Sequence, residues 1–149
     1  MIAVIQRVKK SSVTIENKTV AKIGKGINIL LGIHNTDNAD DALLLAKKIA
    51  NLRIFEDEEG KMNLSLKDIQ GTILAISQFT LCANLKKGRR PSFISAMAPD
   101  DAENTFQKFV AFLRNFGYTV QTGRFGSKMS VGIINDGPVT FVLDSKQLK

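Results

Sequence analysis

The chain has 149 residues, of which 44% are hydrophobic and 23% charged, and its formal net charge is +7. This length and balance fit one globular domain over residues 1–149, and no apolar run reaches the roughly 20 residues that a membrane helix needs. Cys82 is the only cysteine, so an internal disulfide is excluded and the reducing cytoplasm is the expected compartment.

The first 33 residues predict strands. Residues 2–8 and 11–16 alternate apolar and polar side chains, as half-buried strands do. Residues 19–26 end this first hairpin region with two glycines. Residues 27–33, INILLGI, are a continuous apolar run, which is typical of a strand buried on both faces.

A helix is predicted over residues 39–54, where the apolar residues change to helical spacing. Asp37 or Asn38 is its expected N-cap, and acidic residues in the first turn suit the helix dipole. Its apolar face consists of Ala42, Leu45, Ala46, Ile49 and Ala50. Residues 55–63, FEDEEGKMN, predict a charged turn.

A second buried strand is predicted over residues 71–83, followed by a basic loop over residues 86–93. A second helix then begins at Pro99, a residue that suits the first helical position, and Gly117 is its expected stop. Its apolar positions at helical spacing are Ala102, Phe106, Phe109, Val110, Leu113 and Phe116.

The C-terminal segment predicts a short strand over residues 118–123 and a hairpin over residues 130–145, SVGIINDGPVTFVLDS. Its Asp136-Gly137 pair between apolar runs is a hairpin signal. Pro138 conflicts with that signal, because proline has no N–H for a sheet ladder. From the local sequence, the residue is read as part of a turn at a strand edge.

Taken together, these elements predict an α/β domain with the order β-β-(β-α)-(β-α)-β-β-β. Two amphipathic helices can cover one face of a sheet, but seven strands are many for one layer with two helices. A second layer of sheet, or a partner subunit, is therefore expected to cover the rest.

The positive charge favours a polyanionic partner, nucleic acid above all. It is concentrated in the stretch NLKKGRRPSF, which contains Lys86, Lys87, Arg89 and Arg90. An ordinary solvated basic loop is the alternative interpretation.

The usual catalytic constellations are missing from the sequence. His34 is the only histidine, and neither it nor Cys82 stands in a signature of nucleophilic catalysis. No Cys/His cluster has zinc spacing, and no phosphate-binding glycine loop precedes a helix, so neither a metal nor a cofactor is expected. What remains is the polar stretch Ser77-Gln78-Phe79-Thr80 at the end of a buried strand, a position from which functional groups often project.

Several stretches together resemble the D-aminoacyl-tRNA deacylase family along essentially the whole chain. They are AVIQRV, SSVTI, KIANLRIFEDEEGKMNLSL, SQFTL, KKGRRPSF, TGRFG and NDGPVTFVLDS. The two most diagnostic motifs are intact, SQFTL at residues 77–81 and GPVT at residues 137–140.

The resemblance implies a layered β/β/α fold that works as a homodimer. It implies hydrolysis of the ester between a D-amino acid, or mischarged glycine, and the 3′ end of tRNA, with L-aminoacyl esters spared. A Gly137-cisPro138 dipeptide of one subunit is expected to point its carbonyl oxygens into the pocket of the other, where they would clash with an L side chain.

The resemblance also implies roles for individual residues. The backbone N–H groups of Phe79 and Thr80 are expected to form an oxyanion hole, and the 2′-hydroxyl of the terminal adenosine to assist catalysis. The expected binding residues are Ser77 and Gln78 in the pocket, Phe125 and Met129 around the adenosine, Arg7 as a brace for the motif across the dimer, and Lys86, Lys87, Arg89 and Arg90 along the tRNA.

Two other functions are compatible with the sequence. A non-catalytic RNA- or DNA-binding module would use the charge and not the pocket, and damage to either diagnostic motif would favour it. A hydrolase of another nucleotide-linked ester is the third hypothesis, for which the sequence has no separate signal.

Overall fold

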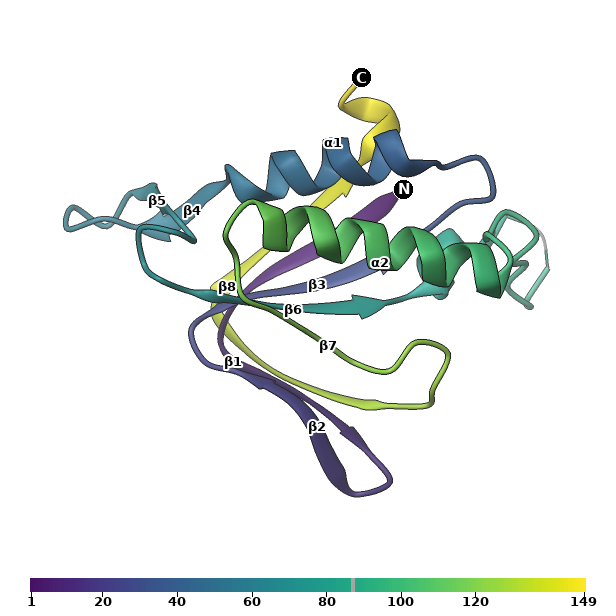
Figure 1. Ribbon diagram of the computed structural model, residues 1–149, viewed down its shortest axis with the longest axis horizontal. Coiled ribbons are helices and arrows are strands. Elements are labelled where there is room, and N and C mark those ends of the chain that lie inside the picture. Colours follow the sequence, from purple (N-terminus) through teal and green to yellow (C-terminus); the bar gives the residue numbers. More distant parts are fainter. Residues whose placement is uncertain (87) are drawn as a thin grey trace.

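Two helices, α1 (Ala39–Ala50) and α2 (Pro99–Asn115), lie side by side over one face of a six-stranded mixed sheet (Figure 1). The computed structural model describes residues 1–86 and 88–149. The main core lies between helices and sheet, and its fully buried side chains include Ala3, Ile5, Ile29, Leu45, Ile73, Phe109 and Leu113. The predicted α/β class is therefore confirmed.

Strand β1 (Ile2–Ile15) is the centre of the sheet because it is paired on both edges. Its first half runs antiparallel to β3 (Gly26–Gly32), and its second half runs antiparallel to β2 (Lys18–Ile23). Its other edge pairs with β8 (Ser130–Asp144). This 14-residue strand therefore has partners along its whole length.

The parallel part of the sheet positions the site described below. Strand β6 (Thr72–Ser77) runs parallel to β3, and β7 (Val120–Thr122) runs parallel to β6. Strand β6 ends at Ser77, and after Gln78 the chain enters a single turn of 3-10 helix, η1 (Phe79–Cys82). The carboxyl ends of β3 and β6 thus meet at the same edge of the sheet.

A second layer covers the face of the sheet away from the helices. The outer half of β1 curls with β2 below β3 and β6, as Figure 1 shows. A second cluster of buried side chains fills the space between the layers: Val8, Val13, Ile15, Ala21, Ile23, Leu74 and Ile76. The surplus strands thus supply a second sheet layer, which gives the predicted β/β/α arrangement.

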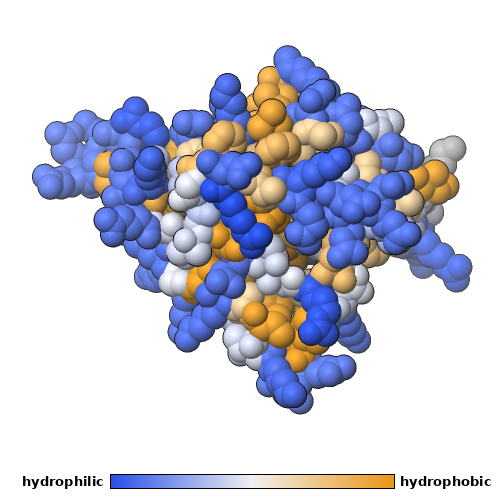
Figure 2. Space-filling view, in the orientation of Figure 1, coloured by the Kyte–Doolittle hydropathy of each residue, from blue (hydrophilic) through white to orange (hydrophobic). Residues whose placement is uncertain are grey.

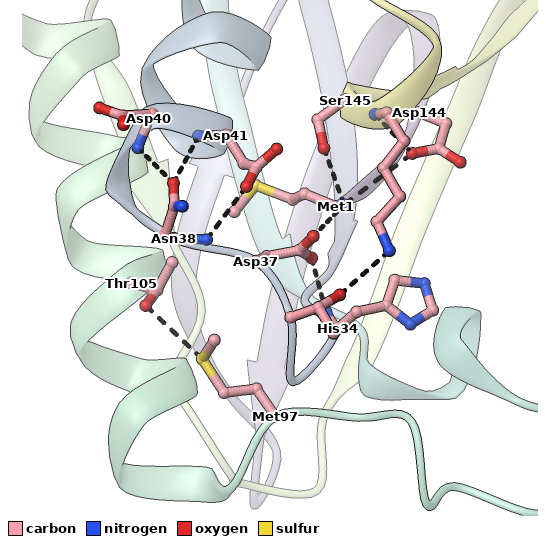
Figure 3. Close-up of polar contacts among 12 residues, drawn as sticks. Met1, His34, Asp37, Asn38, Asp40, Asp41, Met97, Thr105, Asp144 and Ser145 are labelled. Atoms are coloured by element: carbon pink, nitrogen blue, oxygen red, sulfur yellow. Dashed lines mark hydrogen bonds and ion pairs between the residues drawn. The ribbon is translucent and has the colours of Figure 1, made fainter. Parts of the chain in front are cut away.

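Asn38 is the N-cap of α1. Its side chain accepts hydrogen bonds from the Asp40 and Asp41 backbone N–H groups, and the Asp41 carboxylate accepts one from the Asn38 N–H, which completes a capping box (Figure 3). Asp37 has a different role. Its carboxylate accepts from the Met1 ammonium at 2.8 Å and from the His34 backbone N–H at 2.7 Å.

The predicted hairpin over residues 130–145 is wrong, because β8 is one 15-residue strand. Asn135 pairs with Val8 and Thr140 pairs with Gln6, so residues 136–139 bulge out opposite Arg7 alone. This bulge resolves the conflict at Pro138, since a bulged residue gives no hydrogen bond to the ladder. The two apolar runs belong to one strand because both pair with β1, and Figure 1 shows β8 bending along with it.

Other element boundaries also differ from the prediction. The helix predicted over residues 39–54 ends at Ala50, because residues 53–56 form a strand. Residues 2–8 and 11–16 belong to the single strand β1, because β8 pairs across the junction between them. The predicted charged turn is the tip of a short hairpin between β4 (Arg53–Glu56) and β5 (Met62–Ser65). A last turn of 3-10 helix, η2 (Ser145–Gln147), follows β8.

Most of the surface seen in Figure 2 is hydrophilic, with apolar side chains in separate patches. Part of β8 differs, because several large apolar side chains on it are exposed. The exposed fractions of Ile134, Phe141 and Val142 on this strand are 49%, 37% and 67%. An exposed apolar strand is a surface suited to covering by another chain.

Candidate active site

A pocket of about 270 Å³ opens at the carboxyl ends of β3 and β6, beside the start of α2. Ligands of α/β proteins commonly bind at such an edge. Its lining is mainly apolar and consists of Leu31, Ile33, Ile76, Ser77, Gln78, Phe79, Met97, Ala102, Phe125, Gly126, Ser127, Met129 and Val131. Five predicted site residues, Ser77, Gln78, Phe79, Phe125 and Met129, are thus brought together.

The backbone leaving β6 is fixed by the neighbouring strand. The Gln78 N–H donates to the Leu31 carbonyl at 2.8 Å, and the Leu81 N–H then donates back to the Gln78 carbonyl at 3.1 Å as η1 begins. Phe79 and Thr80 are the first residues of this turn, so their N–H groups have no acceptor within it. Two backbone donors are therefore available beside the pocket.

The Thr80 hydroxyl accepts a hydrogen bond from the Gln78 side-chain amide, Nε2 to Oγ1. An amide cannot remove a proton from a hydroxyl, so this contact orients Thr80 without activating it. Thr80 is exposed and does not line the pocket. The side-chain geometry is that of a positioning pair rather than a nucleophile and its base.

Phe125 and Met129 lie on the opposite wall of the pocket, in the connection between β7 and β8. The Phe125 ring is supported by the Phe106 ring of α2, with centroids 6.1 Å apart. Met129 lies against Gly123, where an added Cβ would stand 2.5 Å from its Sδ atom. The glycine therefore makes room for the thioether, and a ring and a sulfur atom together suit the face of a base.

Sequence reasoning missed the wall that α2 and the segment before it supply. Met97 and Ala102 both line the pocket. The Met97 N–H donates to the Ile33 carbonyl at 3.0 Å, which ties this segment to the end of β3. The missed residues are ordinary apolar ones, so their types carry no signal of a binding role.

Arg7 and the Gly137-Pro138 pair do not line this pocket. Arg7 is 4% exposed; its Nη1 donates to the Ile54 carbonyl at 2.8 Å and its Nε donates to the Asp136 carbonyl at 3.2 Å. Its guanidinium also forms ion pairs of 3.3 Å with Glu56 and Asp136. Arg7 therefore braces the motif of its own chain, in which the Gly137–Pro138 peptide bond is cis.

His34 and Cys82 take no part in a catalytic arrangement. His34 follows β3 and forms an isolated bridge with Ala96. The Cys82 side chain is buried, and this burial, and secondarily the charge of Asp37, raises the pKa of its thiol. A raised pKa keeps the sulfur protonated, and a thiol is a poor nucleophile.

The basic loop stands outside the pocket. Asn84 and Ser92 close it through two backbone hydrogen bonds of 2.8 and 3.1 Å. Lys86, Arg89 and Arg90 are exposed within it. Lys87, also predicted to bind tRNA, lies outside the described residues.

Over residues 1–86 and 88–149, the structure contains no cluster of three or more His, Cys, Asp or Glu side chains that could hold a metal ion. Within the same residues, no helix is both long and apolar enough to span a membrane.

The fold and the pocket define a small α/β protein whose pocket, between two parallel strand ends, has mainly backbone donors and apolar walls. Comparison with known proteins gives the family. The model of the D-Tyr-tRNA(Tyr) deacylase family matches residues 4–144, and the chain belongs to this family.

Its relatives match it over nearly their full length. A D-aminoacyl-tRNA deacylase of Sulfurihydrogenibium sp. is 59% identical over 99% of this chain and 100% of its own, and one of Clostridium acetobutylicum is 55% identical over 99% of both. The solved structure of a c-Myc DNA unwinding element binding protein has a TM-score of 0.91 at 43% identity, covering 97% of this chain and 98% of its own. A probable eukaryotic D-amino acid tRNA deacylase, 18% identical with a TM-score of 0.81 over 95% and 97%, shares the fold.

Proposed function

We propose that this chain hydrolyses the ester that joins a D-amino acid to the 3′ end of tRNA, in the cytoplasm. The observation that carries the proposal is the match to relatives named D-aminoacyl-tRNA deacylase over 99% of the chain. The pocket built around Ser77, Gln78 and Phe79 supports it. Glycine attached to tRNA is a further substrate, and L-aminoacyl-tRNA is spared.

The proposed chemistry uses the backbone and the RNA. Water adds to the ester carbonyl carbon, and the Phe79 and Thr80 N–H groups stabilise the negative charge that develops on the carbonyl oxygen. The bond from carbon to the ribose 3′-oxygen then breaks, and that oxygen takes up a proton. The neighbouring 2′-hydroxyl assists these proton transfers, a role for which the pocket lining offers no histidine or carboxylate.

This mechanism makes a prediction for Thr80. Thr80→Ala removes the hydroxyl and its contact with Gln78 but keeps the backbone N–H. We expect kcat to stay within about tenfold of the wild type, whereas loss of a covalent nucleophile lowers kcat by roughly 10⁴-fold or more. Single-turnover hydrolysis of D-tyrosyl-tRNA measures the difference. Near-total loss of activity in a folded variant would contradict this mechanism and make the Thr80 hydroxyl a catalytic group.

Stereoselectivity requires a second copy of the chain. Arg7 pairs with Ile27 at the start of β3, whereas Ser77 pairs with Leu31 near its end. Four residues of strand span roughly 13 Å, so Gly137, beside Arg7, is far from the pocket of its own chain. The proposed homodimer brings the Gly137 and Pro138 carbonyl oxygens into the partner's pocket, with the exposed apolar residues of β8 as part of the contact.

A fixed backbone oxygen in that pocket acts as a chirality sensor. With the amino group and ester held in place, an L-residue would direct its Cβ at the oxygen, while a D-residue directs it away and glycine has no Cβ. Discrimination through a clash rejects one enantiomer without reading the identity of the side chain. This explains a pocket that lacks charged specificity residues.

The basic loop is the proposed contact for the phosphates of the tRNA acceptor stem. Replacing Lys86, Arg89 and Arg90 with Ala is expected to weaken tRNA binding and to reduce the slope of log K against log[salt] by about two to three. Titrations with uncharged tRNA at several salt concentrations measure this slope. The matched control replaces Lys47, Lys48 and Lys108, which are exposed on the helices, and should leave the slope unchanged. Equal slopes for both variants would move the tRNA surface elsewhere.

The decisive experiment compares release of amino acid from D-tyrosyl-tRNA and L-tyrosyl-tRNA by the purified protein. Fast release from the D-ester and release at the uncatalysed rate from the L-ester are expected. Equal rates for the two esters, or no release from either, would refute the proposed function.

DNA binding is the second candidate, and it is favoured by the name of the structural relative with a TM-score of 0.91, a DNA unwinding element binding protein. The net charge of +7 suits either nucleic acid. This candidate would be supported by a duplex DNA that binds as tightly as tRNA at the same salt concentration and leaves the pocket unoccupied.

A further inference from the structure

Two phenylalanine rings form a pair on the rim of the pocket. The rings of Phe79 and Phe93 have centroids 5.0 Å apart and planes inclined at 65°, an edge-to-face arrangement. The Phe79 side chain is nevertheless 59% exposed. An edge-to-face pair uses one face of one ring, so aromatic surface remains open to a ligand.

The pair is held rigidly. Phe79 opens η1, whose backbone is fixed to β3 through Gln78. Phe93 follows Ser92, one of the two residues that close the basic loop, and the Asn35 N–H donates to the Ser95 carbonyl at 2.9 Å just beyond. Both rings therefore stand on backbone that is hydrogen-bonded to the end of β3 or to the segment that follows it, and a fixed ring binds a planar ligand at low entropic cost.

The rim position decides which part of a ligand meets these rings. Among the described residues that line the pocket, Phe79 has the only exposed apolar side chain. A nucleic acid whose terminal nucleoside fills the pocket must leave it across the rim. The nucleotide that precedes the terminal one then passes over Phe79.

The charge beside the rings favours the same ligand. Lys86, Arg89 and Arg90 lie in the loop that Asn84 and Ser92 close, and Phe93 is the residue that follows this loop. Phe79 is exposed and Phe93 is half-buried. Accessible aromatic rings beside a cationic track are the combination that binds single-stranded nucleic acid, with bases stacked on rings and phosphates on cations. Exposed apolar side chains alone would suit a protein partner, but the adjoining cations favour a polyanion.

We propose that Phe79 and Phe93 form a stacking platform for the unpaired base that immediately precedes the terminal adenosine of the substrate tRNA. The inference rests on the proposed function, because the adenosine must occupy the pocket for the next base to reach the rings. The platform reads no base identity, since every base has a face to stack. It would hold the strand so that the ester remains in the pocket.

The experiment compares two substrates: D-tyrosyl-tRNA, and D-tyrosyl-adenosine, which carries the same ester but lacks the preceding nucleotide. Phe93→Leu is expected to lower the ratio of kcat/KM for the tRNA to kcat/KM for the adenosine ester by about tenfold, the scale of one base–aromatic stack. Phe93→Tyr keeps the ring and should keep the wild-type ratio, which guards against a variant that fails to fold. Phe116→Leu, a change of a 38% exposed ring at the end of α2, is the matched control and should also keep it.

The outcomes separate this inference from the proposed function. A wild-type protein inactive on both substrates refutes the function itself. If the wild type is active and Phe93→Leu has the same ratio of kcat/KM for the two substrates, the stacking platform is refuted. Sedimentation of the same variants tests the competing occupant: if Phe93→Leu alters the oligomeric state, the rings belong to an interface between copies of the chain and the platform is likewise refuted.

Discussion

Arg7→Met is expected to lower the free energy of unfolding by about 3 kcal/mol. The side chain is 4% exposed, and its guanidinium holds β1, β4 and the bulge of β8 together through Ile54, Glu56 and Asp136. Methionine has a similar length but cannot donate a hydrogen bond. The Ile54 carbonyl would lose its buried donor, and the Asp136 carboxylate its cation.

Urea unfolding followed by circular dichroism measures this effect, and the thermal midpoint should fall by roughly 10 °C. Lys108→Met is the matched control, because Lys108 is exposed on α2 and surface changes of this kind stay within about 0.5 kcal/mol. Arg7→Lys should fall between Arg7→Met and the wild type, since an ammonium keeps the charge but not the planar fork. If Arg7→Met and Lys108→Met were equally stable, the contacts of Arg7 would contribute nothing to the fold.

The sequence predicts best those features that local periodicity controls. The face of α1 that carries Ala42, Leu45, Ala46 and Ile49 is buried as its spacing indicates, and Pro99 begins α2. The strand over residues 27–33 is likewise found as β3. Each of these features depends on residues that are close together in the chain, within a few helical turns or one strand. A short stretch of sequence is therefore enough to predict it.

Features that depend on distant partners were not predictable in the same way. Asp136-Gly137 has the residues of a hairpin turn, but the chain does not reverse there, because β1 pairs with both halves of β8. No local rule contains that pairing. The same limit applies to Met97 and Phe93, whose positions beside the pocket follow from bonds to the end of β3 and from the ring of Phe79.

Gly137→Ala is expected to reduce the discrimination between D- and L-tyrosyl-tRNA by about 100-fold, because a displacement of about 1 Å in a catalytic site can have an effect of that size. Gly137 has a φ of +121°, a conformation that L side chains rarely adopt. An added Cβ would stand 2.8 Å from Val139 Cγ2 and 3.2 Å from Arg7 Nη2. Both neighbours are constrained, so the backbone of the bulge must shift. Under the proposed function, that shift moves the carbonyl oxygens which exclude L-residues from the partner's pocket.

Gly60→Ala is the matched control. Gly60 has a φ of +76° at an exposed hairpin tip, and no atom lies within 4 Å of an added Cβ. The Gly60→Ala change introduces a similar backbone strain, about 1 kcal/mol, but its Cβ displaces no neighbouring atom. Comparing kcat/KM for the two enantiomeric esters in both variants separates strain from geometry. Loss of discrimination in Gly137→Ala alone places the chirality sensor at the bulge. A folded Gly137→Ala protein that still rejects the L-ester would place the sensor elsewhere in the pocket, because the displaced carbonyl oxygens could no longer meet the L side chain.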